Sequence, residues 1–173
     1  SQVVPHRVMA GSNSSITGIY FGGVDPKSHE YYVYMETFGG GSGARFNKDG
    51  LSCVQVHMTN TSNLPIESME IEFPYMVEQY TLVPDSGGPG KFRGGLSMYK
   101  DIRVLGHDSQ FTVKADRQKT PPWGLFGGKP GLPGVITIYP GTPDETVIDS
   151  KKSGTTLKAN GVLRCQMPGA GGY

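Results

Sequence analysis

Apolar and polar side chains alternate along much of the chain, which is the pattern of β-strands with one buried face. The clearest run, Tyr31–Phe38, is rich in aromatic residues and ends at a glycine cluster. A second run, from Ile66 to Phe73, places Glu70 and Glu72 together on one face if it is extended. We predict further strands at residues 53–57, 75–83, 96–105, 110–115, 135–139, 146–148 and 162–167.

Helical patterns are scarce, because Gly or Pro interrupts almost every window long enough for three helical turns. The apolar runs on either side of His107 and Asp108 predict a hairpin. The chain is therefore predicted to be a mainly β domain, a sandwich or barrel-like stack with long loops rich in Gly and Pro and with little helix.

Long connections separate the predicted strands. The 173 residues include 26 Gly and 13 Pro, which gather at residues 38–50, 84–95 and 121–134. Loops of this length in a compact domain are usually functional or buried against another element. Residues 1–23 are predicted to be a linker, or a strand that belongs to a preceding region.

Charge and cysteine content narrow the class of protein. The formal net charge of +1 gives no reason to expect nucleic acid or a membrane surface as a partner. Charged residues make up only 18% of the chain, which suits a piece of a larger assembly. No apolar run reaches the roughly 18 residues that suggest a membrane span, and no signal peptide is visible. Cys53 and Cys165 are expected to be reduced thiols of a cytoplasmic protein, although the sequence leaves a disulfide open.

Two glycine-rich stretches resemble phosphate-binding loops in letters only. Gly39–Ala44 satisfies the pattern GxGxxG/A, but a turn signal at Arg45–Gly50 follows where a dinucleotide fold needs a helix. The stretch forms either a backbone turn or a set of bare amides that, with Arg45, faces an anionic group. Residues 85–91 are not a Walker A loop, because Asp85 and Phe92 stand where Gly and Ser or Thr are required.

Motifs for a metal ion or a catalytic nucleophile are missing. The four histidines, His6, His29, His57 and His107, lack ligand spacing, and there is no Cys-x-x-Cys. A GxSxG nucleophile elbow is also missing. We expect no complete metal site among these residues.

One polar cluster has the chemistry of a substrate site. His57, Thr59, Asn60 and Thr61 bring an imidazole, two hydroxyls and an amide together at the end of a predicted strand. These donors and acceptors suit a polar, uncharged substrate. The alternative is a strand end whose Thr and Asn side chains bond to the backbone of a turn.

The same residues belong to a series of motifs in which the chain resembles the B-type subunits of hydantoinases and 5-oxoprolinases. The motifs occur in the same order over nearly the whole chain. They comprise residues 38–45 with Asp49 and Gly50, then 57–61, 63–67, 84–95, 117–131 and 168–173. Ala170, where Gly is more usual, departs from the family pattern.

The resemblance implies part of an enzyme that uses ATP to open or hydrolyse cyclic amides such as hydantoins, N-methylhydantoins, 5-oxoproline or lactams. In this family ATP and Mg bind to an A-type subunit, and a divalent metal binds to the N-terminal region of the B-type subunit. This chain would be the C-terminal portion of the B-type subunit, inactive alone and without a cofactor of its own. Its partners would be the remainder of that subunit, the A-type subunit and the cyclic amide. Related subunits occur in ATP-dependent acetone and acetophenone carboxylases, and nothing in the chain separates the two branches.

Four residues are candidates for function. We expect His57 and Asn60 to orient the substrate and Arg45 to lie near an anionic group. Trp123, in a Pro-Pro-Trp loop, is the candidate anchor of a subunit interface, since aromatic residues dominate interface energetics. The alternatives are a Trp buried in its own domain and, for the whole chain, a purely structural docking role.

Overall fold

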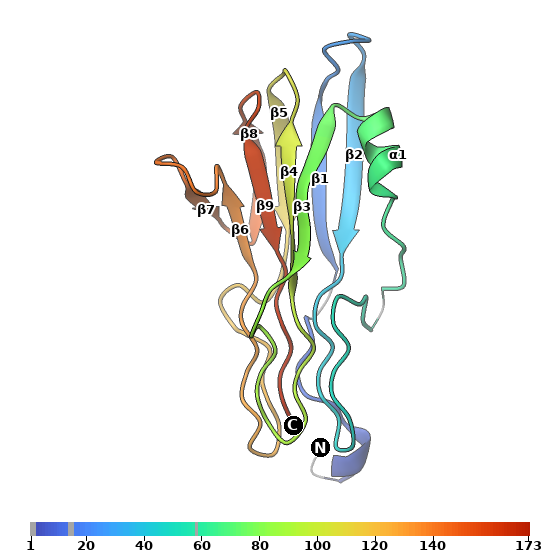
Figure 1. The fold of residues 1–173 in the computed structure, drawn as a ribbon, viewed down its shortest axis with the longest axis vertical. Coiled ribbons are helices and arrows are strands. Elements are labelled where there is room, and N and C mark those ends of the chain that lie inside the picture. Colours follow the sequence, from blue (N-terminus) through green and yellow to red (C-terminus); the bar gives the residue numbers. More distant parts are fainter. Residues whose placement is uncertain (1–2, 14–15, 58) are drawn as a thin grey trace.

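The computed structural model describes residues 3–13, 16–57 and 59–173 and confirms the mainly β prediction. Two antiparallel sheets form a sandwich, and one α-helix, α1 (Ile66–Glu72), lies beside it in the described part of the chain (Figure 1). The first sheet contains β1 (Thr17–Val24), β2 (Tyr31–Phe38), β5 (Ser109–Lys114) and β8 (Lys151–Leu157), in the order β2-β1-β5-β8. The second contains β3 (Tyr75–Leu82), β4 (Met98–Val104), β6 (Val135–Ile138), β7 (Thr146–Ile148) and β9 (Val162–Gln166), in the order β3-β4-β9-β6-β7.

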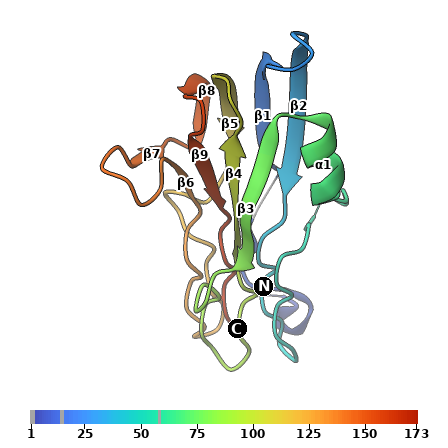
Figure 2. The same ribbon diagram turned by 45° about the horizontal axis from the view of Figure 1, so that its top comes forward.

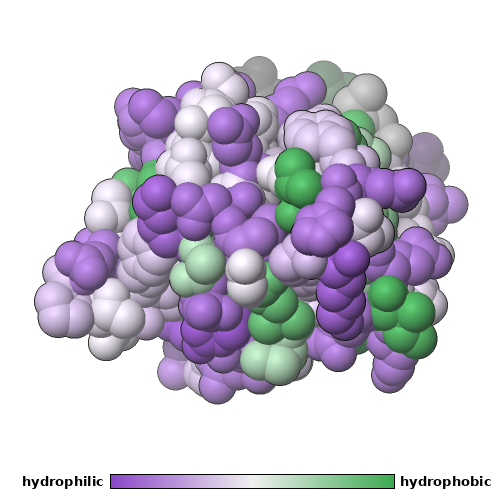
Figure 3. Space-filling model, turned by 90° about the horizontal axis from the view of Figure 1, so that it is seen from above, coloured by the Kyte–Doolittle hydropathy of each residue, from purple (hydrophilic) through white to green (hydrophobic). Residues whose placement is uncertain are grey.

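The core lies between the two sheets. Phe21 and Phe111 of the first sheet face Tyr75, Ile102 and Leu163 of the second, and each is at most 1% exposed. The ring centroids of Phe21 and Tyr75 are 5.0 Å apart, so the sheets are in direct contact. Burial of each such side chain stabilises the fold by about 1.5–3 kcal/mol. Hydrophilic side chains cover most of the end of the molecule seen in Figure 3.

Residues 17–24 form an interior strand of this chain's own sheet, β1, and are not a linker. Thr17 pairs with Phe38 of β2, and Ile19 pairs with Val113 of β5. Pairing on both sides explains why Ile19 is fully buried. The short 3-10 turn Pro5–Arg7 precedes this strand and lies at the opposite end of the molecule from the β1–β2 connection (Figure 1).

The strand predicted at Ile66–Phe73 was wrong, because these residues begin with helix α1. The apolar residues Ile66, Met69 and Phe73 recur at helical spacing, and only Met69 is buried within α1. Pro65 at the N-cap and Pro74 just beyond the end bracket the helix. Glu70 and Glu72 therefore do not share a face, because residues two apart point to different sides of a helix.

The hairpin predicted around His107 was also wrong. β4 pairs with β3 and β9, whereas β5 pairs with β1 and β8, so the chain crosses from one sheet to the other at residues 105–108. Gly106, at φ +71°, supplies the left-handed backbone of this crossing. Residues 53–57 do not form the predicted strand either. Cys53 and His57 have φ of +52° and +57°, and Val54 makes only an isolated bridge to Gly40.

The long loops extend together from one end of the sandwich and pack side by side as a glycine bundle, defined here as residues 8–13, 39–45, 50–54, 86–97, 122–134 and 167–173 (Figures 1 and 2). Residues 167–172 are buried at its centre. Their amides donate to the carbonyls of four other segments, at Gly11, Gly95, Lys129 and Leu132. The loops predicted to be functional or buried are thus buried against one another.

Glycine permits this close approach of backbones, as it does at the axis of collagen. A Cβ at Gly41 would lie 2.2 Å from the carbonyl oxygen of Gly95, and one at Gly43 would lie 1.9 Å from that of Ala10. The GxGxxG-like stretch therefore forms neither a tight turn nor a phosphate cradle. Its glycines are packing positions in the bundle.

Candidate functional site

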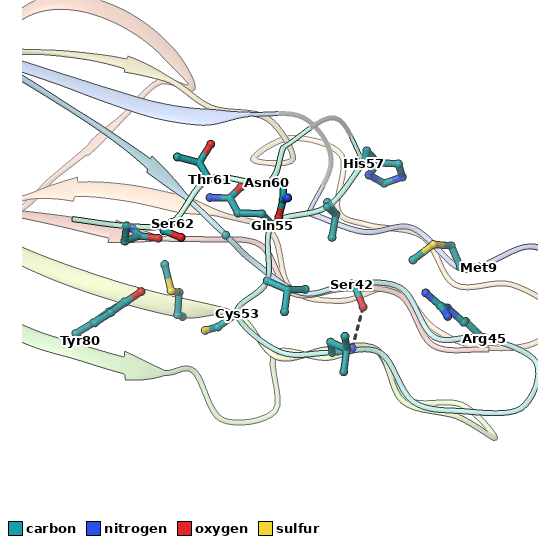
Figure 4. A pocket seen from close by; sticks show the side chains of 16 residues that line it. Met9, Ser42, Arg45, Cys53, Gln55, His57, Asn60, Thr61, Ser62 and Tyr80 are labelled. Carbon is teal, nitrogen blue, oxygen red and sulfur yellow. Dashed lines mark hydrogen bonds between the residues drawn. The ribbon is translucent and has the colours of Figure 1, made fainter. Parts of the chain in front are cut away.

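A cavity of about 700 Å³ opens where the glycine bundle meets the sandwich. Residues 51–63 form one side of it, Ser42 and Arg45 contribute from the bundle, and Tyr80 and Met98 contribute from the second sheet. Figure 4 shows Tyr80 at one end of the cavity and Met9 with Arg45 at the other. This volume is in the range of sites for small organic ligands.

The structure brings Arg45, His57 and Asn60 to this one cavity. All three are exposed, and within the described residues their side chains make no hydrogen bond or ion pair. They are therefore free to bind a ligand. Thr61 and Ser62 add two hydroxyls to the same wall, whereas Met58 lies outside the described residues.

A tight turn holds His57 and Asn60 in place. The backbone N–H and the hydroxyl of buried Thr59 both donate to the carbonyl of Val56, at 3.2 and 2.7 Å. His57 sits between them in the left-handed region. The turn proposed as an alternative to a substrate site is thus present, but its bonds use Thr59 and leave His57 and Asn60 unengaged.

A buried ion pair anchors the next part of this wall to the sandwich. Lys100 Nζ of β4 donates to Glu36 Oε1 and Oε2 of β2 at 2.8 and 2.9 Å, and their side chains are 1% and 2% exposed. Asn63 Nδ2 donates to Glu36 Oε1 at 2.8 Å and to the carbonyl of Thr37 at 3.1 Å. The position of the wall therefore depends on one buried carboxylate.

Sequence reasoning missed this anchor. Glu36 stands at an inward position of β2, between the buried Tyr34 and Phe38. A charged residue at such a position needs a buried partner of opposite charge, and this was the available signal. The sequence did not reveal Lys100 as that partner, because the pair joins two sheets across 64 positions.

Ser42 connects the cavity wall to the bundle. Its hydroxyl accepts from the N–H of Leu51 at 2.8 Å, and its carbonyl accepts from Gly95 at 3.0 Å. Both of its polar groups are thus engaged in packing. Ser42 therefore has no feature of a nucleophile.

The cysteines are free thiols. Burial raises the pKa of the Cys53 thiol, which lines the cavity, to about 11. Cys53 is thus protonated near neutral pH and is not an activated nucleophile. Burial also raises the pKa of Cys165 well above its ordinary value.

Among the residues with a described position, no three or more His, Cys, Asp or Glu side chains are grouped so that they could hold a metal ion. The chemistry of the cavity is that of neutral donors and acceptors with one guanidinium. In the described chain no helix combines the length and the apolar character needed to cross a membrane.

Trp123 lies outside this cavity. It is 52% exposed, which contradicts burial in its own domain. Its carbonyl accepts from Gly11 at 2.7 Å inside the bundle, and the Arg117 guanidinium lies 4.4 Å from the ring centroid. The ring is therefore held in position at the surface.

Known proteins resemble the whole of this chain. The hydantoinase B/oxoprolinase family model matches residues 1–173. A Pseudomonas sp. (strain NS671) protein, named provisionally as the B-type component of a D-/L-hydantoinase, is 34% identical over 174 residues, which are 100% of this chain and 29% of that protein. The chain thus spans less than a third of the length of this relative.

Two solved structures share the fold. The ATP-dependent caprolactamase from Pseudomonas jessenii has a TM-score of 0.73 at 23% identity, over 99% of this chain and 31% of that one. A nucleotide-free acetone carboxylase has a TM-score of 0.71 at 19% identity, over 99% of this chain and 27% of that one. The match of the family model from the first residue to the last decides the family: this chain belongs to the hydantoinase B/oxoprolinase family.

Proposed function

We propose that this chain is the substrate-lining portion of the B-type subunit of an ATP-dependent enzyme that opens cyclic amides such as hydantoins, 5-oxoproline or lactams. The observation that supports this most directly is the convergence of Arg45, His57 and Asn60 on one cavity. A cyclic amide presents N–H donors and carbonyl acceptors. The neutral polar groups of the wall match that chemistry.

The proposed work of these residues is orientation. The imidazole of His57 and the amide of Asn60 would hold the ring by hydrogen bonds, and Arg45 would bind an anionic group at the end of the cavity. Correct placement of a reacting group lowers the barrier, because it removes freedom of motion before the chemical step. ATP with Mg and a divalent metal would be supplied by the A-type subunit and by the remainder of the B-type subunit.

Replacement of His57 by alanine in the complete enzyme tests this role. We expect kcat/KM for the cyclic amide to fall about 10- to 100-fold, which corresponds to one lost orienting hydrogen bond of about 1.5–3 kcal/mol. His29→Ala is the matched control, because His29 is also exposed and also has a positive φ, of 60°. His29 lies in the β1–β2 connection, at the other end of the sandwich.

Unchanged steady-state kinetics of a folded His57→Ala enzyme would remove His57 from the site. The same assay separates the hydrolase from the carboxylase branch. ATP consumption that depends on the cyclic amide and water supports our proposal. Consumption that depends on bicarbonate would favour the acetone or acetophenone type of carboxylase, whose fold the chain shares at 19% identity.

We propose subunit docking as a second role, favoured by the exposed and fixed ring of Trp123. We expect Trp123→Ala to weaken association with the partner subunit at least about tenfold, as for an aromatic hot spot worth about 2 kcal/mol or more. Size-exclusion chromatography over a dilution series measures this change. Intact assembly with full activity at every concentration would rule out the docking role.

A further inference from the structure

A second hollow, of about 500 Å³, lies beside the cavity at the outer end of the glycine bundle. Residues 6–9 form one side of it and residues 45–48 form the other. Met9 and Arg45 line both hollows, so the two adjoin at these side chains. Figure 4 shows this shared end of the cavity, with Met9 and Arg45 next to each other.

The lining of the second hollow is basic. It contains His6, Arg7, Arg45 and Lys48, and no acidic residue lines it. Within the described residues none of these four side chains has a hydrogen bond or an ion pair, although His6 packs edge-on against Phe46 at 6.1 Å.

Basic residues elsewhere in the chain are paired. Arg103 and Arg164 bind Glu78 and Asp101, and Lys158 binds Asp108. Several unpaired basic side chains around one hollow repel one another, and this repulsion falls when an anion binds between them. The hollow therefore favours a negatively charged ligand.

The backbone fixes these basic residues close together. Met9 and Arg45 form an antiparallel bridge, and the N–H of Arg45 donates to the carbonyl of Lys48 at 2.9 Å. The hydroxyl of Tyr173 donates to the carbonyl of Pro5 at 3.0 Å and ties the first segment to the bundle. A cationic site held in this way loses little freedom when it binds a ligand.

We propose that this hollow binds a phosphate group, either of free inorganic phosphate or of a phosphorylated small molecule. A guanidinium binds phosphate oxygens with two parallel hydrogen bonds, and a lysine adds a compact charge. Arg45 contributes to both hollows, so a phosphate held here adjoins any molecule in the cavity. The inference stands apart from the proposed action on cyclic amides, because it rests only on the charge and shape of the second hollow.

Titration of the intact protein with inorganic phosphate, followed by isothermal calorimetry, tests the site. We expect saturable binding whose Kd rises about fivefold in Arg7→Gln and in Lys48→Gln, the effect of losing about 1 kcal/mol for one exposed charge pair. Lys152→Gln is the matched control, because Lys152 is an exposed lysine of β8 outside the hollow. The control should bind phosphate as the unchanged protein does.

Phenyl phosphate distinguishes the two sources of the phosphate group. If the group belongs to a molecule that reaches the cavity, phenyl phosphate binds more tightly than inorganic phosphate, and His57→Ala removes the gain. If the ligand is the free ion, the two bind alike and His57→Ala changes neither. The proposal is overturned if inorganic phosphate shows no saturable binding, or if folded Arg7→Gln and Lys48→Gln proteins both bind it as well as the Lys152→Gln control.

Discussion

Gly171→Ala is expected to destabilise the protein severely, although it adds a single methyl group. The new Cβ would lie 1.9 Å from the carbonyl oxygen of Trp123 and 2.9 Å from the N–H nitrogen of Gly124. Neither neighbour is a side chain that can rotate away. The backbone of the central segment would have to move, although the amides of Gly171 and Gly172 bond to Gly11 and Lys129.

Overpacking of a well-packed interior usually costs about 1–3 kcal/mol, and we expect the upper end or more here because the clash is with backbone. A loss of about 3 kcal/mol lowers the melting temperature of a domain of this size by about 6–12 °C. Thermal unfolding followed by circular dichroism measures the change. If the variant cannot be purified in folded form, the comparison is made by yield of folded protein against the control below.

Gly18→Ala is the matched control. Gly18 lies in β1, its φ is not in the left-handed region, and a new Cβ would meet the side chain of Tyr20 at 3.4 Å, an ordinary contact. We expect no loss of stability, since Ala is favoured over Gly within a strand. Equal melting temperatures for Gly171→Ala and Gly18→Ala would contradict a bundle that depends on close backbone contact.

The neighbouring Ala170 shows that the effect depends on position rather than on burial. Its side chain is 0% exposed, so the bundle already holds a methyl group at this point of the central segment. The residues on both sides differ, because a Cβ at Gly169 would lie 1.9 Å from the carbonyl oxygen of Ser86. Only some positions of an extended segment face another backbone, and those are the positions that require glycine.

The sandwich could be predicted from the sequence wherever a strand has one buried face. The aromatic run that became β2 was found because its inward and outward residues alternate, with Tyr34, Glu36 and Phe38 buried. β1 was missed because Gly18, Gly22 and Gly23 interrupt its apolar pattern. β8 was missed because Lys151–Leu157 is almost entirely polar, as suits an edge strand with most of its residues exposed.

The glycine bundle was beyond prediction, although the loops that form it were recognised. What a glycine does there depends on a partner far away in the sequence, as Gly41 meets Gly95 and Gly94 meets Ala170. No local pattern encodes such a partner. Side-chain chemistry, in contrast, is local, which is why the polar cluster around His57 and Asn60 could be selected as a candidate site. Its proximity to Arg45 depends on the bundle and became visible only in the structure.

Lys100→Met is expected to cost about 3–5 kcal/mol of folding free energy, because it leaves the Glu36 carboxylate buried without its cation. Met preserves most of the length of the lysine side chain, so the change tests charge more than packing. The remaining donor to the carboxylate is Asn63, whose side chain also bonds to the carbonyl of Thr37. Urea unfolding at neutral pH gives the loss directly.

Two further variants show whether the loss comes from the uncompensated charge. Glu36→Gln/Lys100→Met should recover more than half of it, because a neutral amide oxygen can still accept from Asn63 and needs no cation. Lys158→Met removes one partner of the exposed pair with Asp108, whose side chains are 71% and 49% exposed, and should leave stability unchanged. A double variant as unstable as Lys100→Met alone would assign the loss to packing.

The same variants connect the anchor to the cavity. If Glu36 positions the wall through Asn63, Lys100→Met should lower kcat/KM of the complete enzyme, and Glu36→Gln/Lys100→Met should restore part of it. The double variant keeps an acceptor for Asn63, so recovery of activity would follow the hydrogen bond rather than the charge. Activity that stays unchanged in folded Lys100→Met, despite lower stability, would separate the anchor from the site and confine it to holding the two sheets together.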